Sequence, residues 1–163
     1  MSMAIERVSL EIPADANVIL GHAHFIKTAE DLYETVVNSV PGIRFGVAFS
    51  EASGPRLVRS EGNDDGLREA AEREIMKIGC GHTFLIFLRE GYPINLLRDV
   101  RACVEVATIH CATANPVTVL VAREGEAGAI VGVMDGQGPL RVENEAEAKA
   151  RREFVRRIGY KRS

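Results

Sequence analysis

The sequence FGVAFSEASGPRLVRSEGNDD, residues 45–65, decides how the chain folds, because two strands, a turn and a helix start follow one another within it. Its first five residues form an apolar run that is too short for a helix and rich in strand-favouring residues. The run delivers Glu51 to a Ser-Gly-Pro turn, and a second strand, Leu57–Arg59, leads to an Asn-Asp pair where a helix is expected to begin. Ligands gather where strands end in open α/β sheets, so the stretch is a plausible small-ligand site. A hairpin followed by a capped helix explains the same residues without any function.

The other elements follow from hydrophobic periodicity and turn residues. The sequence predicts strands over residues 4–12, 18–27, 83–89, 104–112, 117–123 and 129–134. It predicts helices over residues 28–40, 64–78, 93–102 and 143–158. Thr28 is the expected N-cap of the first helix, with Asp31 at the capping-box position, and Gly79 is the expected C-cap of the second.

The order of these elements mixes hairpins with strand–helix–strand crossovers. Residues 84–88 are apolar on both faces of their strand, which is typical of a central strand covered by helices on both sides. The predicted fold class is therefore α/β, with α+β as the alternative: a mixed β-sheet covered by helices in a three-layer sandwich. The length of 163 residues predicts a single domain over residues 1–163.

Composition narrows the functional classes. A hydrophobic content of 46% and a charged content of 26% are ordinary for a soluble globular protein. The net charge of −3 argues against a nucleic-acid partner, and the lack of a long apolar segment argues against a membrane one. No signal-peptide pattern begins the sequence. Three cysteines without a C-x-x-C pair indicate buried free thiols in a reducing cytoplasm, which is the expected location, and not a zinc site.

Four histidines are the main candidates for chemistry, since the sequence has neither a P-loop nor a G-x-G-x-x-G motif. His22 and His24 would share one face of a strand, but a third metal ligand at a defined spacing is missing, so no metal is expected. His82 follows Gly-Cys-Gly, whose backbone N–H groups could approach an anion. His110 lies within a strand and is most simply a packed residue.

A neutral imidazole can carry a phosphoryl group when a partner orients its other ring nitrogen. Glu51 or Asp64 could orient such a histidine. Lys27 and either Arg56 or Arg59 could neutralise phosphate charge. From residue types and spacing alone, a hydrogen-bonded structural role is favoured for each histidine, so the residues by themselves predict only an α/β domain with a possible anion or nucleotide site.

Long blocks of the sequence, in order, resemble the adenosine-specific kinase family of small archaeal and bacterial proteins. The resemblance runs over essentially the whole chain, and it rests on VILGHAHFIKT (18–28), VPGIRFGVAFSEASGPRLVRSEGND (40–64), GCGHTFLIF (79–87), YPINL (92–96) and CATANP (111–116). It implies a small α/β subunit that assembles as a homotrimer and binds adenosine or AMP in preference to ADP and ATP. It also implies that a histidine can carry the transferred phosphoryl group.

Two histidines stand in motifs that match the family pattern. His24 lies in A-H-F-I-K-T and His82 in G-x-G-H-x-F, and His24 is favoured as the phosphorylated residue. Lys27 and Thr28 follow it at an expected strand-to-helix loop, where N–H groups and a cation could hold a phosphate. His22 stands where the family pattern has glutamine and is discounted as a catalyst. Candidates for contacting the ribose or adenine are Glu51, Ser53, Asn63, Asp64 and Asn95.

Two functions of different class remain open from the sequence. One is an enzyme that transfers phosphate to adenosine through a phosphohistidine, from a donor that the sequence does not name. The other is a non-catalytic adenosine or AMP sensor or scavenger, favoured by the absence of a loop for ATP phosphates. A metal-dependent hydrolase using His22 and His24 is a third, weaker reading. The basic stretch 151–162 is either a solvated helix face or a segment that reaches a neighbouring subunit or a ligand phosphate.

Overall fold

The structure, a computed structural model, describes residues 4–162. Eight strands and four helices occur in it, in an order close to the one that the sequence predicts. They are β1 (Ile5–Ser9), β2 (Asn17–Ala23), α1 (Thr28–Ser39), β3 (Arg44–Ser50), β4 (Val58–Gly62), α2 (Asp65–Ile78), β5 (Thr83–Arg89), α3 (Pro93–Ala102), β6 (Val106–Thr113), β7 (Val117–Glu124), β8 (Ala127–Asp135) and α4 (Glu145–Arg157).

The strands form two sheets, a five-stranded one in the order β4-β3-β5-β2-β6 and a three-stranded one in the order β1-β7-β8. The α/β class is confirmed, but the expectation of one mixed sheet is wrong, because every strand pair in residues 4–162 is antiparallel. The reason is the place of β5. The crossover through α1 makes β2 and β3 run in the same direction, and β5 then inserts between them and pairs with both.

Two hydrophobic cores lie on the two faces of the larger sheet. Helices α1 and α3 cover one face, while α2 and the three-stranded sheet cover the other. Strand β5 contributes to both cores, since Phe84, Ile86 and Leu88 face one and Leu85 and Phe87 the other. The predicted central strand is thereby confirmed, and the layers define a rigid frame for the loops at the sheet's two ends.

The predicted limits of α2 are also confirmed. Asp64 caps its first turn by accepting a hydrogen bond from the Leu67 N–H at 3.1 Å. Gly79 ends it at a φ of 58°, a left-handed conformation that glycine adopts without strain. The next residues, up to His82, therefore leave the helix in a fixed direction toward the end of the sheet.

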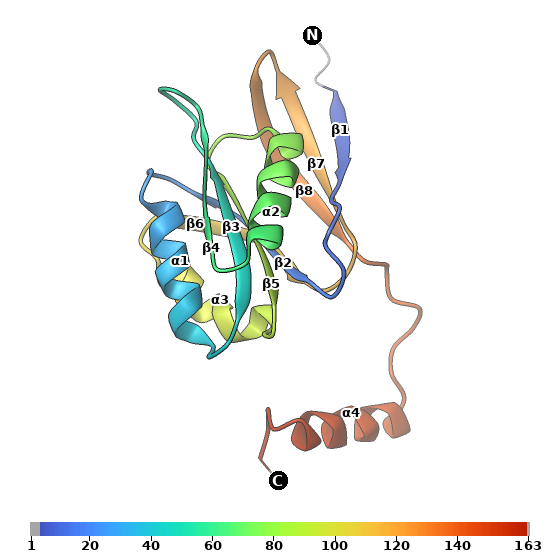
Figure 1. The fold of residues 1–163 in the computed structure, drawn as a ribbon. Coiled ribbons are helices and arrows are strands. Elements are labelled where there is room, and N and C mark those ends of the chain that lie inside the picture. Colours follow the sequence, from blue (N-terminus) through green and yellow to red (C-terminus); the bar gives the residue numbers. More distant parts are fainter. Residues whose placement is uncertain (1–3, 163) are drawn as a thin grey trace.

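The last part of the chain leaves the two cores. Residues 136–144 extend away from β8, and α4 lies apart from the other elements (Figure 1). No residue of α4 is buried. Within residues 4–162, no helix is long and apolar enough to cross a membrane, and all three cysteines are free.

Candidate functional site

A cavity of about 400 Å³ opens at the end of the five-stranded sheet where β2 and β3 finish and β5 begins. This volume lies in the range of about 300–1,000 Å³ that is typical of small-molecule sites. The cavity is lined by residues from the β2–α1 loop, the end of β3 and the start of β5: His24, Phe25, Ile26, Phe49, Glu51, Ala52, Ser53 and His82. The fold thus brings together four of the eight predicted site residues, including both favoured histidines.

His82 is held between the ends of two strands. Its N–H donates to the Ser50 carbonyl at 2.7 Å, and its own carbonyl accepts from the Ala23 N–H at 2.8 Å. Its backbone adopts a φ of 58°, a left-handed conformation in which histidine is more frequent than most non-glycine residues. The imidazole stacks on the ring of Phe49, with an interplanar angle of 13° and centroids 6.2 Å apart. Its orientation is therefore set before any ligand arrives.

The residue before His82 is a glycine, Gly81, because a side chain does not fit at this position. A Cβ atom placed on it would lie 2.7 Å from the Cβ of Ala52 and 2.9 Å from its Cα. Real Cβ atoms do not approach that closely, so only glycine lets the segment after β3 pack against the segment before β5. This close approach brings Glu51 and Ser53 to the same cavity as His82.

His24 lies on a loop that is fixed by hydrogen bonds to its backbone. Its N–H donates to the Glu105 carbonyl at 3.0 Å. The Thr28 hydroxyl reaches the carbonyls of both His24 and Phe25, at 3.2 and 2.6 Å. Phe25 has a φ of 84°, which is a strained value for a bulky residue and is found mostly at functional sites.

The predicted cap of α1 is wrong by one residue. Lys27 occupies the N-cap position without a side-chain cap bond, and Thr28 is the first helical residue. The Thr28 hydroxyl is engaged by the carbonyls of the preceding loop, so it does not cap the helix N–H groups. Thr28 therefore holds the histidine loop closed.

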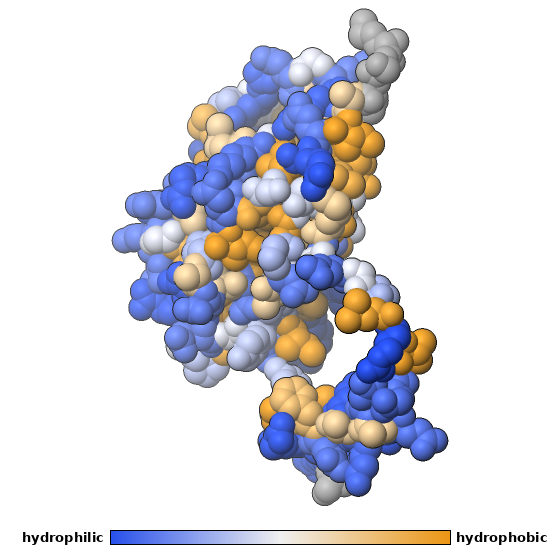
Figure 2. Space-filling model, turned by 90° about the vertical axis from the view of Figure 1, so that its right-hand side faces the viewer, coloured by the Kyte–Doolittle hydropathy of each residue, from blue (hydrophilic) through white to orange (hydrophobic). Residues whose placement is uncertain are grey.

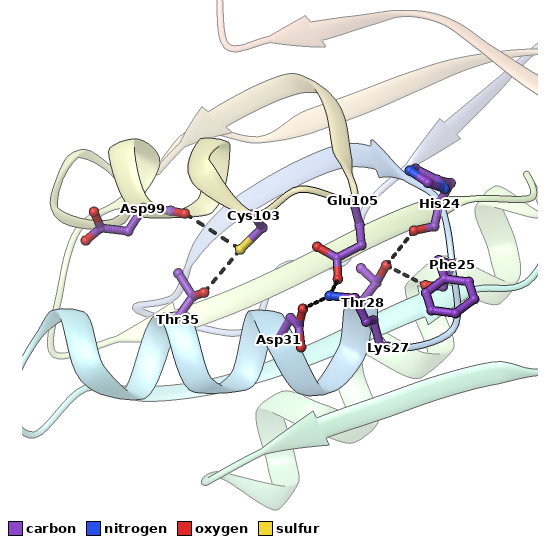
Figure 3. Close-up of polar contacts among 9 residues, drawn as sticks. All are labelled: His24, Phe25, Lys27, Thr28, Asp31, Thr35, Asp99, Cys103 and Glu105. Atoms are coloured by element: carbon purple, nitrogen blue, oxygen red, sulfur yellow. Dashed lines mark hydrogen bonds and ion pairs between the residues drawn. The ribbon is translucent and has the colours of Figure 1, made fainter.

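Lys27 holds the same loop in place through ion pairs with two carboxylates. Its ammonium group lies between the carboxylates of Asp31 and Glu105, while the imidazole of His24 projects away from them (Figure 3). Hydrogen bonds to Asp31 and then Glu105 raise the pKa of Lys27. The Glu105 side chain is only 2% exposed, and apart from this ion pair its oxygens have no hydrogen-bond partner. Lys27 does not line the cavity, so its charge is used within the loop.

Glu51 is the acid in the cavity wall, and its carboxylate is already bonded. It accepts from the Leu57 N–H at 2.8 Å and from the Arg59 guanidinium at 2.7 and 2.8 Å. The Leu57 N–H and, to a smaller extent, Arg59 lower the pKa of Glu51. The acid therefore holds the β3–β4 hairpin in place and keeps negative charge beside the cavity.

Three other predicted site residues lie elsewhere and serve caps and turns. Asn63 bonds the backbone of Phe45 and Ile43, at the start of β3, roughly 17 Å along the strand from the cavity end. Asp64 caps α2. Asn95 accepts from the Tyr92 N–H at the start of α3, beside a different cavity.

Larger cavities exist in residues 4–162, but they lack a comparable set of groups. One of about 640 Å³ adjoins the histidine cavity and shares Glu51 and Ala52 with it. It lies against the end of α2 and the β7–β8 hairpin, and Arg56 and Glu126 pair with each other across it at 2.8 Å. No histidine lines this larger cavity, and no aromatic residue with a positive φ does. The smaller cavity is therefore the candidate site.

His22 connects this cavity to the interior of the sheet. Its ring meets that of His82 edge-on, with centroids 5.8 Å apart. Burial, followed by His82 and His24, lowers the pKa of His22, while burial and then His22 lower the pKa of His110. Within residues 4–162, no three histidine, cysteine or acidic side chains are placed to hold a metal ion. Burial thus favours the neutral imidazole at His22 and His110.

Acid should destabilise the protein through these two histidines. Because their pKa values are lower in the folded state, the unfolded chain binds more protons, and stability falls as pH drops below about 6.5. The variant His22→Gln, which keeps a polar side chain without a titrating ring, should lose part of this dependence. Urea unfolding at pH 7.5 and pH 5.5 measures it. An unchanged pH slope in His22→Gln would contradict a contribution from His22.

The fold and the cavity define a small α/β protein with two histidines in one preformed cavity. The model of the adenosine specific kinase family matches residues 8–161, so the chain belongs to that family. The crystal structure of the PH1918 protein from Pyrococcus horikoshii OT3 is similar, with 40% sequence identity and a TM-score of 0.94. The match covers 99% of this chain and 100% of that one. No curated protein matches the sequence.

Proposed function

We propose that this protein binds adenosine or AMP in the cavity of His24 and His82 and transfers a phosphoryl group to adenosine through a phosphohistidine. The observation that supports this best is the meeting of both histidines in one cavity, in a chain of the adenosine-specific kinase family. The rigid backbone around the two imidazoles favours chemistry, because a nucleophile acts efficiently only when its position is fixed.

His24 is the proposed nucleophile. A ring nitrogen of neutral His24 attacks the phosphorus of a phosphoryl donor, so that an N–P bond forms while the donor's P–O bond breaks and its electron pair leaves with the donor oxygen. The 5′-hydroxyl of adenosine then attacks the same phosphorus, the N–P bond breaks, and the freed ring nitrogen of His24 takes up the hydroxyl proton and passes it to water. Helix α1 begins at Thr28, four residues after His24, and the partial positive charge of its amino end favours the phosphoryl group.

The other cavity residues have supporting roles in this proposal. Phe49 and Phe25 offer apolar walls for the adenine, and Ser53 and Glu51 stand at the side where ribose hydroxyls could bond. Lys27 acts through the loop, since its ammonium group is paired with two carboxylates. The family resemblance also leads us to propose a homotrimer.

A non-catalytic adenosine or AMP sensor is the second candidate. The sensor is favoured because Lys27 pairs with the carboxylates of Asp31 and Glu105, and no lysine or arginine is among the residues that line the cavity. In that case His24 donates a hydrogen bond to the ligand and forms no bond to phosphorus. Both candidates predict that adenosine or AMP binds, but only the enzyme predicts turnover.

Calorimetric titration with adenosine, AMP, ADP and ATP in parallel tests the binding that both candidates share. We expect heat with adenosine and AMP and much less with ADP and ATP. Equal affinity for all four ligands, or no heat with any, would contradict the proposal. Assaying AMP formation from adenosine with a panel of phosphoryl donors then separates the enzyme from the sensor.

A further inference from the structure

The last segment of the chain buries none of its helix against the part of the subunit that the structure describes. We define residues 136–162 as the C-terminal arm, which consists of an extended linker and α4. Figure 2 shows it projecting below the body of the molecule, with an open space between the linker and the body and with apolar side chains on the linker and the helix. Leu140 and Val142 in the linker are almost fully exposed, and Phe154 and Ile158 on the helix are about half exposed.

A helix in this situation needs a surface to pack on. Isolated helices of about 12–15 residues are marginal in water, and most helices in proteins are stabilised by burying one face. Phe154, Val155 and Ile158 share such a face with Ala148, since they recur three, four and seven residues apart. None of them is buried. The matched crystal structure aligns over 99% of this chain, so the arm belongs to the shared architecture.

The charges of the arm and of the rest of the chain are opposite. The arm with Ser163 carries a net charge of +4 and residues 1–135 carry −7, counting Lys and Arg against Asp and Glu. Three of the arm's four glutamates already pair with basic residues of the arm itself. At its end, Arg152, Arg156 and Arg157 form no salt bridge with any acid in residues 4–162.

A groove on the body of the molecule has the complementary character. Two cavities of about 520 and 510 Å³ adjoin at the end of the sheet opposite the histidines, and both are lined by Asp15, Asn17 and Tyr92. Asp15 and Glu90 are exposed there without a salt-bridge partner in residues 4–162. Beside them, Tyr92 and Ile94 expose more than 60% of their surfaces. We name this surface the acidic groove.

We propose that the C-terminal arm of one copy docks on a second copy of this chain, with the apolar face of α4 in the acidic groove. Phe154 and Ile158 would cover Tyr92 and Ile94, and the arginines at the end of α4 would face the free acids. This inference goes beyond the proposed function, because it names the segment and the surface that hold the subunits together and needs no ligand.

The arm is tested by the oligomeric state of the full chain, measured by light scattering and sedimentation over a dilution series. The wild-type chain should form an assembly of more than one copy. Phe154→Asp should shift it to monomer, whereas the control Ala146→Asp should not, because it adds the same charge on the side of α4 away from the apolar face. A wild-type monomer, or an assembly that survives Phe154→Asp, would overturn the proposal.

The groove is tested by the same measurement. Ile94→Asp should also release monomers, and Met76→Asp, an exposed position on α2, serves as its control. Mixing Phe154→Asp with Ile94→Asp should then restore complexes, because one chain keeps its groove and the other keeps its arm. Failure of the mixture to associate, or no effect of Ile94→Asp, would overturn the docking site. Adenosine titration of each variant is a separate readout, so a failure of this inference is distinguishable from a failure of the proposed function.

Discussion

Replacing His24 with alanine should abolish phosphoryl transfer to adenosine while leaving adenosine binding nearly intact. Removal of a nucleophile typically lowers turnover by at least about 10³-fold, because the remaining groups bind substrate but offer no covalent route. The side chain of His24 is exposed, so its truncation leaves both cores unchanged. The measurements are AMP formation, acid-labile phosphate bound to the protein, and the calorimetric affinity for adenosine.

His82 provides the matched comparison. His82→Asn is the appropriate variant, because asparagine tolerates the left-handed backbone at φ 58°, where alanine would add strain. It removes the ring that stacks on Phe49 and lines the cavity, so it should weaken adenosine binding and still allow labelling of His24. If His82→Asn lost the protein-bound phosphate and His24→Ala kept it, the assignment of the two histidines would be reversed. Normal turnover in both variants would contradict a phosphohistidine on either residue, whereas no turnover in the wild type would leave only the sensor.

The elements that the sequence predicted well are those defined by local chemistry. The strand Thr83–Arg89 and the helix Pro93–Ala102 have the expected limits, since an apolar run and a proline determine them locally. Asp64 and Gly79 end α2 as expected for the same reason. Sheet order was less accessible, because the insertion of β5 between β2 and β3 depends on contacts between residues far apart in the chain.

The candidate site was predicted in part. His24 and His82 were identified from their motifs, and the fold brings them to one cavity. Phe25 was missed, because no residue type signals a positive φ at an aromatic position. Glu105 was missed for another reason: its contact with Lys27 joins residues 78 positions apart, and an acid inside a predicted strand has no distinctive spacing.

Replacing Lys27 with methionine should lower the free energy of unfolding at neutral pH. The change leaves the buried Glu105 carboxylate without its cation and beside Asp31, and an uncompensated buried charge destabilises the folded state. Solvent reaches Lys27, whose side chain is 44% exposed, so the loss should be smaller than for a fully buried pair. Urea unfolding at pH 7.5 measures the loss. The double variant Lys27→Met/Glu105→Gln should recover most of it, and an unchanged free energy of unfolding in Lys27→Met would show that the pair does not hold the loop.

The pH dependence of the stability of Lys27→Met is a second test of the same ion pair. In the wild type, the Lys27 ammonium between Asp31 and Glu105 helps to lower the pKa of Asp31, so the contribution of Asp31 to stability is complete above the unfolded value near 3.9 and is lost as pH falls. Without Lys27 the two carboxyl groups repel, and one of them should take up a proton in the folded state. Its pKa is then raised, so the penalty of Lys27→Met should shrink as the pH is lowered from 7.5 toward 4.5. The backbone carbonyl of Glu105 also accepts the His24 N–H, so Glu105 connects Lys27 to the histidine loop. If Lys27 acts by holding this loop, the adenosine turnover of Lys27→Met should recover together with its stability as the pH is lowered. A lysine that contacts phosphate directly would leave the variant inactive at both pH values.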